Sequence, residues 1–242
     1  MLFLLHYDQY LYFAIVLHLG ALLNVVTIEN YTLQDAATGS RLRDFNFGLA
    51  KGETCAIDAD SADDARLLAG ALATLIYPLS GTYMFRETVL DFGNYQNLLD
   101  IKRQIGYFGP HAALVSNMTV RQNLMLTRAY FENRLDLDLG DDVKDLCAEF
   151  QLIEKLDLRP TALSPKDIRA AIIIREISKP VQLFIMDSPE VLIGQPGFRV
   201  LVAKLEQMTA DGLPLVLLCE NNELKARLTK RAVRIPSGGL KL

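Results

Sequence analysis

Four aspartates stand close together in the segment 58–64, between an apolar run at 54–57 and a helix with an apolar stripe; they are Asp58, Asp60, Asp63 and Asp64. The first turn of a helix exposes N–H groups and the positive end of the dipole, so it favours an anion. Asp63 or Asp64 is therefore predicted to cap this helix, as the protein's own substitute for a phosphate. Clustered carboxylates also suit Ca²⁺ or Mg²⁺, which is the alternative, although the DxDxDG spacing of a calcium loop is missing.

The elements around this segment alternate between strands and helices. Apolar runs at 183–186 and 215–219 are typical of buried strands, and helices are predicted at 165–177 and 197–209. The apolar stripe of the helix after the aspartates runs from Leu67 to Ile76 and includes Leu75. Thr119 and Gln122 form a capping-box pattern, which predicts that another helix begins there. Continuous apolar strands that alternate with helices indicate a parallel sheet covered on both faces. A strand, a short loop and a helix in this order is also the setting of a phosphate-binding loop.

Composition limits the classes of protein that fit. The chain has 242 residues and a net charge of −4, and half of its residues are apolar. This length and composition suit one large α/β domain. No excess of positive charge is available for phosphate contacts along a nucleic acid, so a nucleic-acid partner is not expected. The three cysteines are far apart and form no CxxC pair, which argues against a disulfide framework or a zinc site.

The first 23 residues are predicted to be a separate apolar extension. This segment contains no lysine or arginine, so it is a poor signal peptide and a poor basic membrane helix. Asp8 and Gln9 interrupt it, and the remaining apolar run of roughly 14 residues is short of the about 20 that a spanning helix needs. Packing on the protein itself is one interpretation; docking on a membrane partner or on lipid is the other.

Seven short landmarks follow one another along the rest of the chain. They are LRDFNFGLAKGE (42–53), YPLSGTYMF (77–85), IGYFGP (105–110), NMTVRQNL (117–124), LSPKD (163–167), LFIMDSP (183–189) and VLLCEN (216–221). In this order the segment 24–242 resembles the ATP-binding cassette domain of ABC transporters. The resemblance implies a P-loop NTPase-like α/β fold with a RecA-type core, an antiparallel β subdomain and a helical subdomain at about 112–165. The stretch 112–120 is similar to the lipid-trafficking mammalian-cell-entry type.

The phosphate loop of that family reads GxxxxGK[ST], and its glycines, lysine and hydroxyl hold the phosphates and Mg²⁺. At the aligned positions this chain has Asp58 and Asp63 for the glycines, Asp64 for the lysine and Ala65 for the hydroxyl residue. Like charges about 4 Å apart repel by roughly 4 kcal/mol per pair at an effective dielectric of about 20. The alignment therefore predicts that no nucleotide binds in this loop and that no cofactor is needed.

Other positions of the resemblance are also changed. Asp187 matches the acid that supports Mg²⁺, so it is the candidate metal ligand, but the next residue is Ser188 where the family has a catalytic glutamate. A hydroxyl without an activator is no general base near neutral pH. Glu220 replaces the switch histidine, and Pro110 replaces the glutamine of the Q-loop.

The signature sequence of the family, LSGGQ, is LSPKD in this chain. Ser164 is kept, Pro165 replaces the first glycine and removes one backbone N–H, and Lys166 replaces the second glycine. The cation of Lys166 could meet a phosphate that is bound on an opposed subunit.

The loss of lysine, glutamate and histidine together favours a catalytically inactive subunit, a pseudo-ATPase rather than an enzyme, that serves assembly or regulation of a membrane transport complex. The expected partners are a membrane permease, bound in a groove near 109–126, and a second cassette of the same or another kind. The chain would then be cytoplasmic and peripheral at the inner face of the cell membrane, with only indirect membrane contact. Two alternatives remain: a regulatory module of the same fold outside transport, and a residual ATPase that uses ATP and Mg²⁺.

Overall fold

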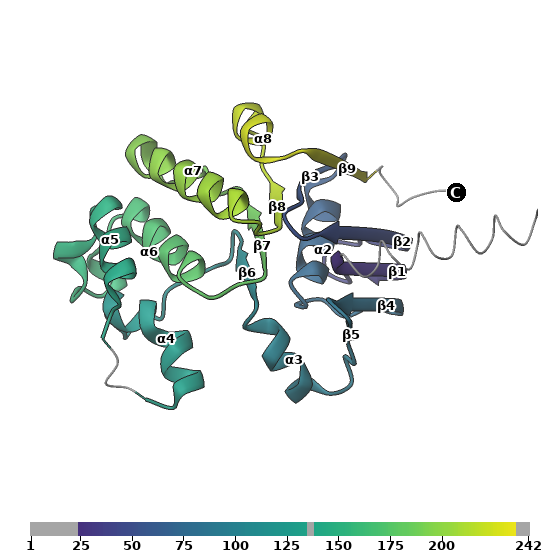
Figure 1. Ribbon diagram of the computed structural model, residues 1–242, viewed down its shortest axis with the longest axis horizontal. Coiled ribbons are helices and arrows are strands. Elements are labelled where there is room, and N and C mark those ends of the chain that lie inside the picture. The colour runs from purple at the N-terminus through teal and green to yellow at the C-terminus, as the bar shows by residue number, and fades with distance from the viewer. Residues whose placement is uncertain (1–23, 135–137, 236–242) are drawn as a thin grey trace, which may run out of the picture.

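The computed structural model describes residues 24–134 and 138–235, which form two sheets and the helices around them (Figure 1). The strands are β1 (Asn24–Gln34), β2 (Arg41–Ala50), β3 (Thr54–Ala59), β4 (Ser80–Phe85), β5 (Thr88–Val89), β6 (Ile105–Phe108), β7 (Leu183–Asp187), β8 (Leu215–Leu218) and β9 (Arg231–Ile235). The helices are α2 (Ala62–Leu72), α3 (Tyr95–Lys102), α4 (Val120–Glu132), α5 (Asp141–Glu149), α6 (Pro165–Ile177), α7 (Gly194–Ala210) and α8 (Asn222–Leu228), with 3₁₀ turns η1 (Ile153–Lys155) and η2 (Pro160–Ala162).

The central sheet is parallel, as predicted, and has the strand order β6-β7-β8-β3-β9. Strand β7 is buried along its whole length, which explains why its sequence is a continuous apolar run ending in one acid. The second sheet is antiparallel, with the order β2-β1-β4-β5. The predicted combination of a parallel core sheet, an antiparallel sheet and helices is confirmed.

Helix α2 joins the two sheets into one core. It contacts strands of both, and Leu68 and Leu72 of its apolar stripe are completely buried. In Figure 1 it stands between the antiparallel strands and the central sheet, whereas α4, α5, α6 and α7 gather on the far side of the central sheet. The start of α2 is thereby fixed beside the ends of the parallel strands.

Some local features differ from the sequence pattern. Helix α2 ends at Leu72, so Leu75, which lies on the predicted stripe, is exposed. Helix α3 buries only Leu98, so it has no apolar stripe that a sequence pattern could reveal. The predicted capping box of Thr119 and Gln122 is confirmed at the head of α4.

The predicted helical subdomain, 112–165, holds only part of the helices between β6 and β7, because α6 begins at Pro165 and ends at Ile177. Helices α4 and α5 and the turns η1 and η2 all fall inside 112–165. The division of the chain into subdomains stays a prediction, and so does the role of the extension 1–23, which lies outside the described residues. The three cysteines are buried and free.

Two glycines with positive φ test how tightly β4 approaches β1. Gly81 has φ +97°, and a Cβ there would meet the backbone oxygen of Asn30 at 2.4 Å, whereas Gly39 has φ +75° and open space. We expect Gly39→Ala to lower the free energy of unfolding by about 1 kcal/mol and Gly81→Ala by about 3 kcal/mol, because only the second adds overlap to backbone strain. Urea unfolding measures both values. Equal losses of unfolding free energy in the two variants would show that Gly81 does not lie so close to the backbone of Asn30.

Candidate functional site

The carboxyl ends of four neighbouring parallel strands bring the predicted site segments to one edge of the central sheet. Strand β3 leads into the aspartate segment, β6 into Gly109 and Pro110, β7 into Ser188, and β8 into Glu220. In open α/β sheets ligands bind at this edge. Residues that are up to 162 positions apart in the sequence are thus candidates for one surface.

The loop between β3 and α2 is very short. Strand β3 stays paired with β9 as far as Ala59, and the N–H of Asp60 donates to the carbonyl of Ile235 at 3.2 Å. Helix α2 begins at Ala62, so only Asp60 and Ser61 lie between strand and helix. Such a loop leaves little free backbone to surround a phosphate.

The cap of α2 differs from the prediction. The N-cap is Ser61, whose hydroxyl oxygen accepts the N–H of Asp63 at 3.2 Å, and not a carboxylate of Asp63 or Asp64. Both aspartates lie in the first turn, where their charge still complements the helix dipole. Asp64, at the position of the family's lysine, is only 6% exposed.

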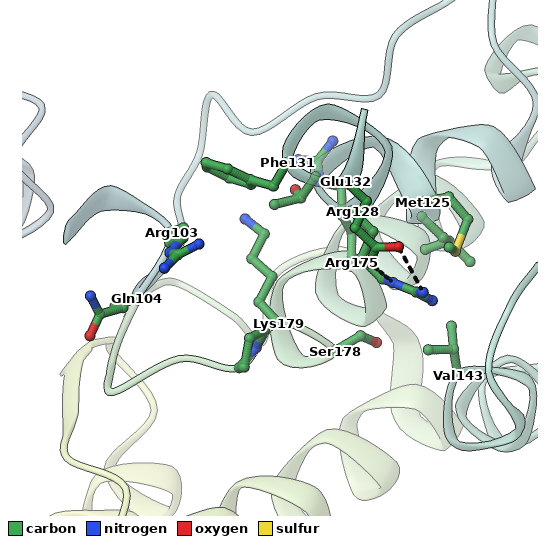
Figure 2. A pocket seen from close by; sticks show the side chains of 13 residues that line it. Arg103, Gln104, Met125, Arg128, Phe131, Glu132, Val143, Arg175, Ser178 and Lys179 are labelled. Carbon is green, nitrogen blue, oxygen red and sulfur yellow. Dashed lines mark hydrogen bonds and ion pairs between the residues drawn. The ribbon is translucent and has the colours of Figure 1, made fainter. Parts of the chain in front are cut away.

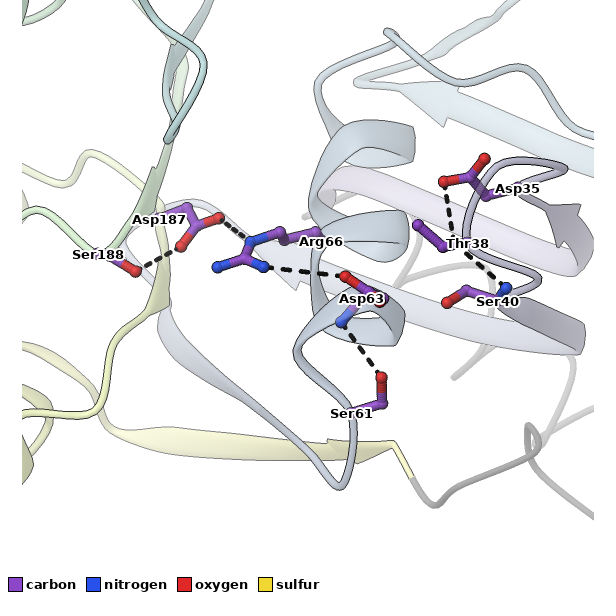
Figure 3. A network of polar contacts seen from close by, with 8 residues as sticks. All are labelled: Asp35, Thr38, Ser40, Ser61, Asp63, Arg66, Asp187 and Ser188. Carbon is purple, nitrogen blue, oxygen red and sulfur yellow. Dashed lines mark hydrogen bonds and ion pairs between the residues drawn. The ribbon is translucent and has the colours of Figure 1, made fainter.

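Asp187 is only 2% exposed, and both of its carboxylate oxygens are occupied. Arg66 donates from Nε to Oδ2 at 3.0 Å, and the hydroxyl of Ser188 donates to Oδ1 at 2.7 Å. Figure 3 shows Arg66 reaching from α2 toward Asp187, with Asp63 on its other side at 3.9 Å. Sequence reasoning missed Arg66, although it is the nearest cation to the aspartates along the chain. Its charge lies between the carboxylates of Asp63 and Asp187 and compensates the buried one.

Other cations neutralise the rest of this edge. Lys225 of α8 contacts Asp58 at 2.7 Å, and this hydrogen bond raises the pKa of Lys225. Arg234 of β9 lies 3.6 Å from Asp60. The aspartates of 58–63 are therefore held mainly by ion pairs with this chain's own cations. Among the residues that the structure describes, no three or more His, Cys, Asp or Glu side chains form a group able to hold a metal ion.

A buried arginine, which sequence reasoning also missed, ties the strand ends together. Arg169 of α6 donates to the carbonyls of Ser188 at 2.9 Å, Val191 at 3.2 Å and Gly109 at 3.4 Å, and it stacks 3.9 Å from the ring of Phe108. Burial lowers the pKa of Arg169, although the nearby acids oppose this shift. The loops after β6 and β7 are thus fixed by a single side chain.

The start of α6 holds the signature residues. The hydroxyl of Ser164 donates to Asp167 at 2.7 Å in a capping box, and Lys155 pairs with the other oxygen of Asp167 at 2.8 Å. Burial raises the pKa of Asp167, but the bonds from Lys155 and Ser164 outweigh it and leave that pKa below its usual value. Pro165 and Lys166 are exposed at the first turn. Lys166 is in no ion pair among the described residues.

The remaining predicted positions are open to solvent. Pro110 is exposed after β6. Glu220 is exposed after β8, and its backbone N–H donates to the carboxylate of Glu190 at 3.3 Å. The structure thus places these residues after the strands where the resemblance put them, and their chemical roles, like that of Asp187 as a metal ligand, stay predictions.

No family model matches this chain. It is 26% identical over 198 residues to the macrolide export ATP-binding/permease protein MacB of Campylobacter jejuni, covering 81% of this chain and 31% of MacB. It is 24% identical to the lipoprotein-releasing system ATP-binding protein LolD 2 of Chlorobium chlorochromatii, covering 87% of this chain and 89% of LolD. The dimeric ABC transporter cassette MJ0796 matches 90% of this chain with a TM-score of 0.76 at 17% identity. The chain is a homologue of the ATP-binding cassettes of ABC transporters.

This relationship corrects three predictions. A catalytically inactive subunit, an absence of enzyme activity and an absence of any nucleotide cofactor were expected, and all three are wrong by this comparison. The relatives MacB and LolD are ATP-binding components, and so are the methionine importer MetN and the molybdenum importer ModC. These names point to an ATPase subunit. The narrower mammalian-cell-entry type stays a prediction, and the chain spans about a third of the MacB length.

The residues at the start of α2 cannot bind a triphosphate in the way that the family's GxxxxGK[ST] loop does. Position 64 carries a carboxylate, the free loop is two residues long, and Arg66 is engaged with Asp187. The hydroxyl of Ser188 donates to Asp187, and a hydroxyl is a poor general base near neutral pH. The phosphates of a nucleotide therefore need positive charge from elsewhere at this edge.

The role of Arg169 is open to a direct test. We expect Arg169→Lys to lower the free energy of unfolding by about 2–4 kcal/mol, because an ammonium group cannot serve all three carbonyls and leaves some of them buried and unpaired. The matched control is Arg121→Lys, at an exposed pair with Asp157, which should cost less than about 1 kcal/mol. Chemical unfolding measures both free energies. Similar small losses of stability in the two variants would contradict the conclusion that Arg169 fixes the loops after β6 and β7.

Proposed function

We propose that this chain is the ATP-binding cassette subunit of an ABC-type membrane transport complex, an ATPase component. The observation that carries the proposal is the agreement along nearly the whole chain with ATP-binding cassettes, in sequence over 87% with LolD and in fold over 90% with MJ0796. The gathering of the strand ends at one edge, around Asp187, supports the same conclusion.

The proposal includes a second cassette, either another copy of this chain or a different one. The structural relative MJ0796 is described as dimeric, and its post-hydrolysis form is bound to ADP and Pi. In this chain the exposed Lys166 stands in the first turn of α6, where the helix dipole also favours an anion. This placement supports a contact from Lys166 to phosphates that lie across the interface between two cassettes.

The proposed permease contact is the segment 109–118 between β6 and α4. Most of it is exposed, including Val115 at 38%, yet its shape is fixed from beneath. Buried Asn123 accepts the N–H of Val115 at 2.7 Å and donates to the carbonyl of Val115 at 3.1 Å, and Arg175 donates to the carbonyl of Ala113 at 2.9 Å. A rigid, exposed loop of this kind favours docking of a partner because little ordering entropy is lost.

A permease partner would place the chain at the cytoplasmic face of the membrane. None of the helices in the described part of the chain is long and apolar enough to span a bilayer. We therefore propose that the chain is held at the inner face of the cell membrane by its permease.

Nucleotide binding tests the proposal. We expect the purified chain to bind Mg-ATP weakly, and Asp64→Lys to tighten binding at least about tenfold, since the exchange replaces a buried repulsive charge with an attractive one. The matched control, Asp142→Lys in the first turn of α5, should leave the affinity unchanged. Isothermal titration calorimetry measures all three. No saturable binding by the wild-type chain up to about 10 mM ATP would contradict the proposal.

Membrane association tests the permease contact separately. In the native host, Val115→Asp should reduce recovery of the tagged chain with washed membranes at least about fivefold. The new carboxylate would lose its hydration in the contact with the permease, and this loss weakens binding. Val89→Asp, an equally drastic change at an exposed valine of β5, is the control and should have no effect. Unchanged recovery of Val115→Asp, with the chain correctly folded, would refute this contact.

A further inference from the structure

Asp63 lacks a full counter-charge at the edge of the central sheet. Its one ion pair among the described residues is with Arg66, at 3.9 Å, and the guanidinium of Arg66 makes a closer contact, 3.0 Å, with the buried Asp187 (Figure 3). The side chain of Asp63 is 52% exposed. Ser61 caps α2 through the backbone N–H of Asp63, so the carboxylate is not used in the cap. Negative charge therefore remains uncompensated at the start of α2.

Lys166 is a cation without an acid on the same edge. It is exposed in the first turn of α6, and no carboxylate of the described residues pairs with it. Other surface cations do have partners in their own chain; in the pocket between α4 and the end of α6, for example, Arg128 pairs with Glu132 at 2.9 Å (Figure 2). The helix dipole opposes a cation in a first turn, so an anion brought close to Lys166 is stabilising.

Asp63 and Lys166 lie on opposite sides of the loop that follows β7. Helices α2 and α6 cover opposite faces of the central sheet (Figure 1), and both begin at its carboxyl edge. Arg66 of α2 reaches Asp187 at the end of β7, whereas Arg169 of α6 donates to carbonyls of the loop after it. The two charges thus share one edge of the sheet but do not pair within one copy of the chain.

The loop between these charges carries exposed apolar side chains. Val191 is 48% exposed and Leu192 is 64% exposed. Leu192 has φ +65°, a conformation that residues other than glycine rarely adopt. Arg169 donates to the carbonyl of Val191 at 3.2 Å, which fixes the loop from beneath. A fixed apolar projection loses little ordering entropy when a partner buries it.

We infer that two copies of this chain pair edge to edge without nucleotide, with Lys166 of each copy against Asp63 of the other. A two-fold axis makes an interface self-complementary, so a contact between positions 166 and 63 occurs twice. An axis through the loop after β7 meets this condition, because the two charges lie on opposite sides of that loop. Val191 and Leu192 are then buried near the axis and contribute apolar area, while the charges select the orientation.

This inference deepens the proposed function, on which it rests for the face where two cassettes meet, by naming the second cassette as another copy of this chain. It also gives Lys166 an anionic partner in the absence of nucleotide. Phosphates that reach Lys166 across the interface then displace the carboxylate of Asp63, so that one anion replaces another. Nucleotide therefore competes with this contact and is not needed to form the pair.

Sedimentation equilibrium of the full chain, in EDTA and without nucleotide, measures the dissociation constant of the dimer. We expect the wild type to dimerise in the micromolar range. Lys166→Glu alone and Asp63→Lys alone should each raise the dissociation constant at least about tenfold, because each places like charges together at both contacts. A wild-type chain that stays monomeric up to about 100 µM would overturn the inference.

An equal mixture of the two variants is the most specific measurement. In a mixed pair each contact again joins one cation and one carboxylate, so the dissociation constant should return to within about threefold of the wild-type value. Restoration by mixing also shows that both variants are folded. If Asp63→Lys does not fold, Asp63→Asn removes the charge and should weaken the dimer at least about threefold.

The matched controls are Lys230→Glu, at the opposite edge of the sheet before β9, and Asp142→Lys, in the first turn of α5. Each should change the dissociation constant by less than about twofold. Variants of Lys166 and Asp63 that dimerise like the wild type, or that mixing does not restore, would overturn the inference. Because sedimentation is measured without ATP, such a result leaves the proposed function to its own test by nucleotide binding.

Discussion

The carboxylate of Asp187, buried at the end of the central strand β7, is the charge on which the arrangement of the sheet edge depends. An ionised carboxylate that is 2% exposed is costly unless hydrogen bonds and an opposite charge compensate it. Arg66 and Ser188 provide both. Because Arg66 belongs to α2 and Asp187 to β7, this compensation also fixes the first turns of α2 relative to the central sheet.

The same interaction determines what the edge can bind. Homologous cassettes are named for binding ATP, yet in this chain the aspartates of 58–63 and Asp187 are paired with its own side chains, Arg66, Lys225 and Arg234. An incoming phosphate competes with these carboxylates for the same cations. Exposed Lys166, on α6, is free of that competition, which is why the proposed function places phosphate contacts across an interface between two cassettes.

Much of the fold was predictable because its determinants are local in the sequence. The apolar run 183–186 predicted a buried parallel strand, and Thr119 with Gln122 predicted the head of α4. Helix α3 could not be predicted in this way, since it buries only one leucine. The order of the seven sequence segments indicated a similarity to ATP-binding cassettes, and the comparisons support that similarity.

The chemistry of the site was less predictable, because it depends on side chains from distant segments. Arg66 meets a carboxylate 121 residues away, and Arg169 serves carbonyls after two different strands. Neither residue belongs to a motif of the resemblance. The substituted motif positions alone led to the prediction of an inactive subunit without a cofactor, which the named relatives contradict; a substitution shows which group is missing and not which group replaces it.

A double-mutant cycle on Arg66 and Asp187 tests the central claim most directly. The free energy of unfolding is measured by urea titration for the wild type, Arg66→Gln, Asp187→Asn and the double variant. If Arg66 neutralises the buried carboxylate, the two changes are coupled by about 1–3 kcal/mol, and the double variant is less destabilised than the sum of the single ones. Effects that add within about 0.5 kcal/mol would show that the two side chains act independently and would contradict the claim.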